Sequence, residues 1–214
     1  MGNKNLFARI VTPFAFVIVW VMIITIVAFS HVSSFSKDLR MVIFNKPVSE
    51  KMDNIYTTVG KDSGEINASE IKYPTLGVVF GKIEIPELKI SQNLVFGDSN
   101  PDLKKGVGMF AGSHFPGESS TCLIAGHNDE KFNALKNVKD GMQIIISTNY
   151  GKYVYKISKT KVAEPTDTSA YDLDAPVDNI ILYTCYPFDA PGFKTKRLFV
   201  YGEYVSGPKI NIYK

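Results

Sequence analysis

The chain has 214 residues and a mass of 23.8 kDa, with 45% hydrophobic and 21% charged residues, which excludes a disordered chain and leaves room for one sizeable domain with accessory segments. Of its 24 basic residues only Lys4 and Arg9 precede position 37, so the remaining 22 nearly balance the 21 acidic residues, although the formal net charge is +3. This balance excludes the basic footprint of a nucleic-acid-binding protein, and two cysteines with three histidines are too few for a disulfide-rich scaffold or a multi-site metal protein.

The first predicted element is a membrane-spanning helix over residues 10–29, the uncharged run IVTPFAFVIVWVMIITIVAF. As a helix this run would cover roughly 30 Å, the thickness of the hydrocarbon core of a bilayer. A cleaved signal peptide is the alternative, since Ala28-Phe29-Ser30 resembles a small-x-small cleavage site, but signal peptides usually hold only ~7 to 15 apolar residues. The two N-terminal cations place residues 1–9 in the cytoplasm, so the sequence predicts a single-pass protein of the cell membrane whose remaining chain is extracellular.

Residues 30–75 mix Ser, Lys, Asp, Glu and Asn with scattered apolar residues and hold no sustained helical period. We therefore predict an extracellular stalk over this range. It leads to a folded domain over residues 76–206, and residues 207–214 are predicted to form a C-terminal tail.

Within the folded domain, short β-branched and aromatic runs alternate with Gly, Pro, Asn and Asp, a pattern typical of strands separated by turns. Eight strands are predicted, over residues 79–85, 88–96, 107–111, 121–126, 142–148, 152–162, 179–185 and 197–205. Only residues 100–105 and 129–138 have helical patterns, the second behind a possible cap at Asn128 or Asp129. Eight short strands without long intervening helices predict a mostly β fold, either a closed barrel or a sandwich.

Cys185 is the first residue with catalytic potential, because it ends a predicted strand directly before Tyr186 and Pro187. Proline cannot donate to a strand ladder, so the strand stops there and the thiol lies at the rim of the fold. Arg197 opens the next strand after an 11-residue loop, and antiparallel pairing of the two strands would set the Cβ atoms ~5 Å apart. Since a free thiol is mostly un-ionised at neutral pH, a cationic or imidazole neighbour would activate it.

His127 is the second candidate, because it follows the predicted strand over 121–126 directly. Each candidate also has a plain structural interpretation. A lone histidine is more often a surface residue and an arginine on a strand is usually solvated, while Cys185 could be a buried apolar residue or form a disulfide with Cys122. Strand alternation sends Cys122 to the opposite face from its two neighbours, in apolar surroundings that fit an inert thiol. Residue types and spacing alone therefore leave the catalytic interpretation open.

Four separated motifs add a family resemblance. The stretch LYTCYPF, with Arg197 twelve positions after its cysteine, is preceded in order by GKIEIPELKI, PGESS and CLIAGH. Together these motifs resemble the sortase family, nearest to its class D, over roughly residues 76–205, and the N-terminal anchor and stalk also match. The Leu-x-Thr-Cys signature of that family corresponds to residues 182–185, and class D members often continue Tyr-Pro-Phe, as this chain does.

The resemblance implies a closed eight-stranded β-barrel with short helices. It assigns roles to four residues: nucleophile to Cys185, acid/base to His127, oxyanion stabilisation or substrate positioning to Arg197, and substrate binding or orientation of the site to Thr184. It gives no role to His114 or to His31. Where many relatives follow the catalytic histidine with Arg-Asp, this chain has Asn128-Asp129.

The reaction that the resemblance implies is acyl transfer without a cofactor or metal. Cys185 would attack the threonine carbonyl of a sorting signal similar to Leu-Pro-x-Thr-Gly, near the C-terminus of a secreted protein, and form a thioester. An amine on a peptidoglycan precursor would then accept the protein. The expected partners are therefore sorting-signal proteins and a cell-wall peptide, with no nucleic acid.

Two alternatives stand beside this interpretation. The first is a different extracytoplasmic cysteine acyl-transferase, such as a wall-crosslinking transpeptidase, although the Ser-His-Gly-Cys type of motif of those enzymes is missing from the sequence. The second is a non-catalytic, membrane-tethered β-domain that binds surface partners, with Cys122 and Cys185 joined as a disulfide.

Overall fold

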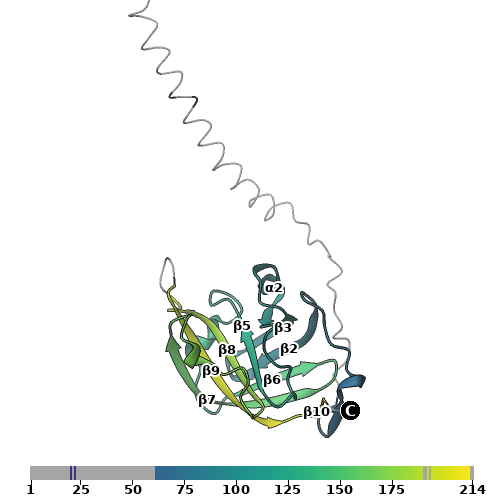
Figure 1. The fold of residues 1–214 in the computed structure, drawn as a ribbon. Helices are drawn as coiled ribbons and strands as arrows, with labels where there is room; N and C mark the ends of the chain where they lie inside the picture. Colours follow the sequence, from purple (N-terminus) through teal and green to yellow (C-terminus); the bar gives the residue numbers. More distant parts are fainter. Residues whose placement is uncertain (1–19, 21, 23–60, 190–191, 193, 213–214) are drawn as a thin grey trace, which may run out of the picture. The chain divides into compact units, whose positions relative to one another are not determined.

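The structure is a computed structural model that describes residues 20, 22, 61–189, 192 and 194–212 (Figure 1). Of the predicted anchor over 10–29, only Trp20 and Met22 fall among these residues, and both are helical; the rest of the anchor lies outside the described residues. Within the described part of the chain, no helix combines the length and the apolar character needed to cross a membrane. The chain divides into two compact units, Met1–Lys51 and Met52–Lys214, and the strands that the structure describes all lie in the second.

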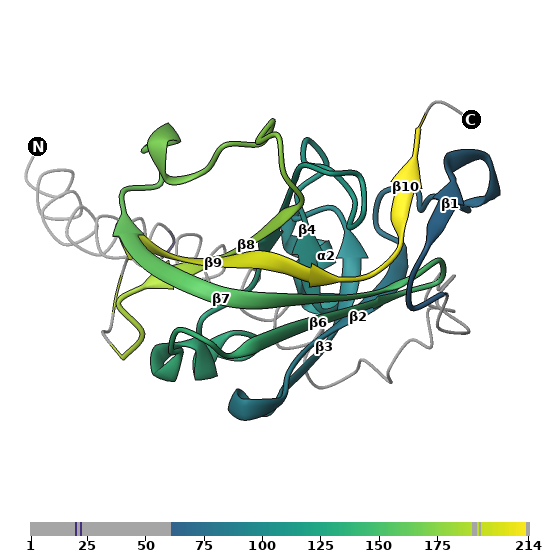
Figure 2. The ribbon, with the colours of Figure 1, turned by 90° about the horizontal axis from the view of Figure 1, so that it is seen from below.

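Eight strands of the second unit close into a barrel in the order β2-β3-β4-β5-β8-β9-β7-β6 (Figures 1 and 2). Their bounds are β2 Val79–Ile85, β3 Ile90–Phe96, β4 Val107–Met109, β5 Thr121–Ala125, β6 Gln143–Thr148, β7 Lys152–Ala163, β8 Asn179–Tyr186 and β9 Lys196–Ser206. Each predicted strand is present, with ends that differ by two residues or fewer. The closed, mostly β barrel confirms that part of the predicted fold class.

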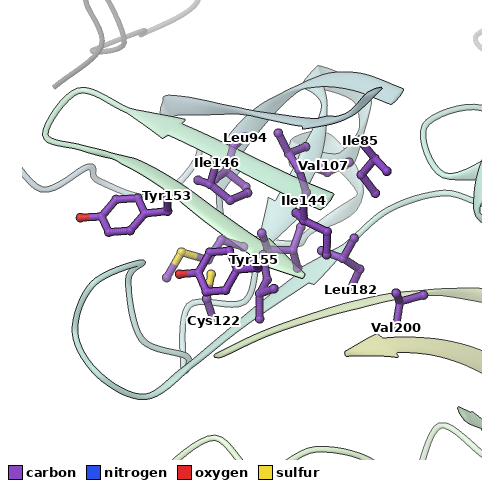
Figure 3. Close-up of a cluster of buried hydrophobic side chains, with 14 of the residues drawn as sticks. Ile85, Leu94, Val107, Cys122, Ile144, Ile146, Tyr153, Tyr155, Leu182 and Val200 are labelled. Atoms are coloured by element: carbon purple, nitrogen blue, oxygen red, sulfur yellow. The ribbon is translucent and has the colours of Figure 1, made fainter. Parts of the chain in front are cut away.

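Alternating side chains fill the interior of the barrel, as period-2 patterning requires. On β7, Tyr153, Tyr155 and Ile157 are buried, while Lys152 before them and Lys156 between the last two are exposed. These residues pack with apolar side chains from β2, β3, β5, β6, β8 and β9 in one continuous cluster, part of which Figure 3 shows. Each fully buried isoleucine of that cluster contributes roughly 1.5–3 kcal/mol, so the core holds the strand ends in fixed register.

Two short helical segments border β3. A 3-10 turn, η2 (Pro86–Leu88), precedes it and ends at Lys89 in the left-handed region (φ 55°), so β3 begins two residues later than predicted. The predicted helix after β3 is present as α2 (Asn100–Lys105), closed at its N-terminus by reciprocal hydrogen bonds between Ser99 and Asp102.

The predicted helix over 129–138 is wrong, since only a 3-10 turn, η3 (Asn133–Asn137), forms there. The backbone N–H of Phe132 donates to the carbonyl of His127 at 2.8 Å, and this closes a loop before η3 begins. The Asn128 side chain, one of the two residues predicted as a possible cap, donates to the backbone of β8 instead. A long-range contact has replaced the local cap.

The ends of the folded unit also differ from the predicted boundaries. Two three-residue strands, β1 (Glu65–Asn67) and β10 (Lys209–Asn211), pair in parallel and form a second sheet (Figure 2). β1 and the following 3-10 turn, η1 (Ala68–Glu70), belong to the predicted stalk, and Ile66, Ile71 and Ile210 join the main core cluster. The stalk predicted up to residue 75 and the tail predicted from residue 207 therefore contribute to the folded domain, because strands this short carry no sequence period.

Cys122 is fully buried on β5 and points into the main cluster, where Figure 3 shows it beside Tyr155. Its neighbour Leu123 belongs to a second apolar cluster on the other face of the sheet, as the alternation predicts. Burial, with smaller contributions from Asp178 and Glu118, raises the pKa of the Cys122 thiol far above its usual range, so this thiol stays protonated and unreactive.

We expect Cys122→Ser to reduce stability while turnover is retained. The hydroxyl would lie in apolar surroundings at a cost of about 1 kcal/mol, without reaching the site described below. Urea unfolding and peptide-transfer kinetics measure the two effects separately. Loss of activity in a variant that is fully folded would contradict this assignment.

Candidate active site

Cys185 and Arg197 face one another across neighbouring strands. β8 and β9 pair antiparallel, and their register sets Cys185 directly opposite Arg197, with both side chains half-buried. This is the pairing that the sequence predicts from the connection between the two strands. Directly opposite residues on an antiparallel pair point to the same face, so the thiol and the guanidinium share one side of the sheet.

His127 reaches the same edge from β5. This strand runs parallel to β8, with Ala125 opposite Tyr183. The contact continues past the end of β5, because the N–H of Gly126 donates to the carbonyl of Tyr183 at 3.1 Å and the hydroxyl of Thr184 donates to the carbonyl of Gly126 at 2.7 Å. If this register continued for two more residues, His127 would lie opposite Cys185. Three of the four candidate residues therefore meet at one rim of the barrel.

Thr184, the fourth candidate, has a different place from the one that a substrate-binding role requires. Its side chain is buried, on the opposite face of β8 from Cys185, and its hydroxyl already donates to the carbonyl of Gly126. A direct contact with substrate is therefore not supported by its position. The residue instead ties the end of β5 to β8 and so holds His127 near the thiol, which is the orienting alternative of its predicted role.

An apolar pocket of about 150 Å³ lies next to the Cys185–Arg197 pair. Tyr183 and Phe199, each two residues from a member of the pair, share its face of the sheet and line the pocket together with Arg197. The other walls come from three connections between elements and from β5: Asp98, Phe110, Leu123, Pro165 and Tyr171. A cavity of about this volume can hold a group the size of benzene, so the pocket has room for one apolar side chain of a ligand.

Aromatic stacking and one hydrogen bond shape this pocket. The ring of Phe199 stacks with Tyr171 and Tyr183, at centroid distances of 6.3 and 6.0 Å. The Tyr183 hydroxyl donates to Asp98 at 3.0 Å. Burial first, and then the nearby carboxylate, raise the pKa of Tyr183 far above its usual range, while the Arg197 charge acts to lower it. Tyr183 is therefore a neutral wall of the pocket.

Only one nitrogen of the Arg197 guanidinium is bonded to the protein among the described residues. Its Nη1 donates to the carbonyls of Lys194 and Lys196, at 3.2 and 2.9 Å. Within the described part of the chain, Nη2 and Nε make no hydrogen bond, so these donors can serve a ligand. A guanidinium fixed at one corner and open at the others suits the binding of an oxygen that carries developing negative charge.

The two cysteines are both free, and the fold keeps them apart. Cys122 is paired in register with Ile180, so Cys185 lies five residues farther along β8. At ~3.3 Å per residue that separation is about 16 Å, well beyond the ~7 Å limit for the Cα atoms of a disulfide. The alternative in which the two cysteines form a structural disulfide is therefore wrong.

The remaining residues with chemical potential lie away from this rim. His114 approaches Glu118 and Asp174 at 3.8 and 3.5 Å, and its N–H bonds to the start of β5, whereas His127 follows the end of that strand. His31 lies outside the described residues. Among the residues that the structure does describe, no group of three or more His, Cys, Asp or Glu side chains could hold a metal ion.

Sequence reasoning did not find Asn128, Lys194 or the aromatic walls of the pocket. Asn128 is buried, and its amide N–H₂ donates to the carbonyl of Cys185 at 2.8 Å. The only sequence signal at this position is that Asn128 stands where many relatives have the arginine that follows the catalytic histidine. The side-chain partners of Asn128 lie more than 50 positions away in the sequence, which a local pattern cannot show.

Comparison with known proteins agrees with this geometry. The sequence model of one family, described as the sortase domain, matches residues 83–205. Among curated proteins, Sortase D of Bacillus subtilis is 35% identical over 133 residues, which cover 62% of this chain and 67% of that protein. All four candidate residues, Cys185, His127, Arg197 and Thr184, lie within the matched range.

Solved structures of several sortases share the fold. Sortase C of Clostridium perfringens matches with a TM-score of 0.55 and 32% identity over 61% of this chain and 72% of its own. It has also been solved with the C-terminal cell wall sorting motif, with the same measures of similarity. Sortase A of Corynebacterium diphtheriae matches with a TM-score of 0.55 and 28% identity, over 59% of this chain and 60% of its own. These matches confirm the closed eight-stranded barrel.

Proposed function

Because the chain belongs to the sortase family, class D, we propose that it is a membrane-anchored cysteine transpeptidase that joins secreted proteins to the cell wall. One observation carries the proposal: Cys185, His127 and Arg197 converge at the rim of the barrel where an apolar pocket begins. Residues 10–29 would anchor this domain on the outer face of the membrane, with residues 1–9 in the cytoplasm, as the hydropathy and charge of the sequence predict.

The pocket suits a peptide whose apolar residues precede the bond to be cleaved. It begins two residues before Cys185 on β8, and it has room for one leucine or proline side chain. Since a related sortase C was solved with a cell wall sorting motif, we infer that the substrate here is a similar signal of the Leu-Pro-x-Thr-Gly type. The signal would lie near the C-terminus of a secreted protein and be cut between threonine and glycine.

In the first half of the reaction, the Cys185 thiolate attacks the threonine carbonyl carbon and a C–S bond forms. The carbonyl oxygen becomes an oxyanion, to which the open donors of Arg197 can contribute hydrogen bonds and charge. His127 then donates a proton to the glycine nitrogen, and the C–N bond breaks. The products are a thioester on Cys185 and a peptide with a free amino group.

In the second half, an amine on a peptidoglycan precursor attacks the thioester carbonyl. His127, now neutral, accepts a proton from that amine, and the C–S bond breaks to regenerate the thiolate. The secreted protein is then joined to the wall peptide by an amide bond. Water in place of the amine would give cleavage without transfer.

Incubation of the full-length protein in detergent with fluorescent sorting-signal peptides tests this proposal, with and without a short peptide that offers a free amine. We expect cleavage of an LPxTG-like peptide between threonine and glycine, and a ligated product when the amine is present. Failure to cut any peptide of the set, or cleavage at another bond, would contradict it. A ligated product formed by the Cys185→Ala protein would do the same.

Tyr171→Ala should weaken substrate binding more than chemistry. Tyr171 lines the pocket and stacks on Phe199, and it lies in the connection between β7 and β8, outside the strands that carry Cys185 and Arg197. Its loss removes one apolar wall, so we expect KM to rise about tenfold, the equivalent of about 1.4 kcal/mol, while kcat changes little. Steady-state kinetics with one signal peptide measure both constants. An equal fall in kcat with unchanged KM would contradict this role for the pocket.

A further inference from the structure

Asn128 links the loop that carries the acid/base to the end of the strand that carries the nucleophile. It follows His127 in the chain, and its side chain is buried, with only 6% of the residue exposed. The amide N–H₂ donates to the backbone carbonyl of Cys185 at 2.8 Å and to that of Pro187 at 3.3 Å. The residue that follows the candidate acid/base is thus bonded directly to the backbone of the candidate nucleophile.

The oxygen of the same amide is engaged by Lys194. The Lys194 ammonium donates to Asn128 Oδ1 at 3.2 Å and to the carbonyl of Phe188 at 3.1 Å. The backbone carbonyl of Lys194 in turn accepts from Arg197 Nη1 at 3.2 Å. A continuous chain of hydrogen bonds therefore runs from the backbone at Cys185, through Asn128 and Lys194, to the guanidinium of Arg197.

Only a side chain with a donor and an acceptor can complete this chain of contacts. A carboxylate at position 128 would keep the bond to Lys194 but would face two carbonyl oxygens without a proton to share, whereas the amide satisfies all three partners. The Asn128 backbone carbonyl is also fixed, since it accepts from the Asn133 side chain at 2.9 Å. Buried polar groups that are fully bonded in this way hold their neighbours in one arrangement.

We propose that Asn128 and Lys194 are positioning residues that set the relative placement of Cys185, His127 and Arg197 for acyl transfer. The expected change in kcat rests on the proposed function, whereas the hydrogen bonds are present without any substrate. Neither side chain is assigned contact with the reacting atoms. Both act through the backbone at the strand ends and through the loop between β8 and β9.

Asn128→Asp and Lys194→Met test the two halves of this arrangement. Asn128→Asp removes the N–H₂ group that donates to Cys185 and Pro187 but keeps an oxygen that can accept from Lys194. Lys194→Met removes the ammonium but leaves the Asn128 amide bonded to those two carbonyls. Because a misplacement of about 1 Å can cost 10²-fold in rate, we expect kcat of Asn128→Asp to fall about 10²-fold with KM nearly unchanged. Lys194→Met should show a smaller loss of kcat in the same pattern.

Matched controls separate positioning from general stability. Asn149 also donates its amide to a backbone carbonyl, that of Lys72 at 3.2 Å, but it lies in the turn between β6 and β7, at the far end of β7 from Arg197. Asn149→Asp should therefore change thermal stability without changing kcat. Lys196→Met is the control for Lys194, since the Lys196 side chain is exposed and only its backbone contacts Arg197.

A second readout needs no sorting peptide: the rate at which iodoacetamide alkylates Cys185, followed by peptide mapping. We expect Asn128→Asp to react several-fold more slowly than Asn149→Asp, because Cys185 loses its fixed relation to His127 and Arg197. If the wild type transfers peptides but Asn128→Asp matches Asn149→Asp in kcat and alkylation rate, the positioning role is overturned. If the wild type transfers no peptide while alkylation still slows in Asn128→Asp, the positioning role stands and the proposed function fails. Should Asn128→Asp fail to fold, an unchanged kcat and alkylation rate in Lys194→Met overturns the proposal.

Discussion

Cys185→Ala is expected to abolish both peptide cleavage and transfer while leaving the barrel folded. The substitution removes the atom that forms the thioester, and no other residue at the rim can replace it, because Cys122 is buried on the far side of the sheet. The thiol is half-buried at a strand end, so its loss removes little packed volume. Circular dichroism and thermal unfolding check the fold, and a peptide-cleavage assay checks the activity.

Cys122→Ser is the matched control for that variant, since it changes the other thiol of the chain. It should retain turnover under the same conditions. A Cys185→Ala protein with activity close to wild type would exclude Cys185 as the nucleophile. A Cys185→Ala protein without activity and without a folded barrel would be uninformative alone, so Cys185→Ser, which keeps the shape of the side chain, is measured beside it and should also be inactive.

Arg197→Lys is expected to lower kcat/KM by about 10²- to 10³-fold, the effect of losing one oxyanion donor, and Arg197→Ala to lower it at least as much. The guanidinium is held at Nη1 by two backbone carbonyls, and among the described residues Nη2 and Nε have no hydrogen-bond partner. A lysine has one compact ammonium, which cannot bond those carbonyls and a substrate oxygen in the same fork geometry. Shape as well as charge is therefore required at this position.

Lys196→Ala provides the control for Arg197, because it removes a neighbouring exposed cation from the same strand. Lys194 is unsuitable for that purpose, since its ammonium bonds Asn128. We expect Lys196→Ala to retain the wild-type kcat/KM. Near-normal rates for Arg197→Lys, or equal losses of kcat/KM for Lys196→Ala and Arg197→Ala, would contradict a specific catalytic role for the arginine.

The barrel strands were predictable from the sequence because their signal is local. The alternation of apolar and polar residues along β7 predicts a strand, and the proline after β8 predicts where β8 ends. Both signals come from neighbouring residues and do not depend on distant partners. The pairing of Cys185 with Arg197 followed from the same information, since strands joined by a single loop commonly pair antiparallel. The rim position of the thiol was therefore a consequence of strand ends alone.

The parallel contact between β5 and β8 could not be predicted in this way. His127 and Cys185 are 58 positions apart, and only the register of those two strands brings them together. The family resemblance, rather than spacing, supplied that association. Asn128 is one of two residues whose type favours a helix cap locally, but its buried amide donates to the backbone of β8 instead. The strands β1 and β10 are too short to show any period, so their place in the fold appears only in three dimensions.

The most direct test of the account is to map the acyl-enzyme. The full-length protein is mixed with a sorting-signal peptide in the absence of an amine acceptor, quenched in acid and digested, and the adduct is located by mass spectrometry. We expect the peptide fragment ending in threonine to be joined as a thioester to the segment that contains Cys185, and to disappear when an amine is added. An adduct on Cys122, or none while the peptide is being cleaved, would contradict the assignment of Cys185 as the nucleophile of a transpeptidase.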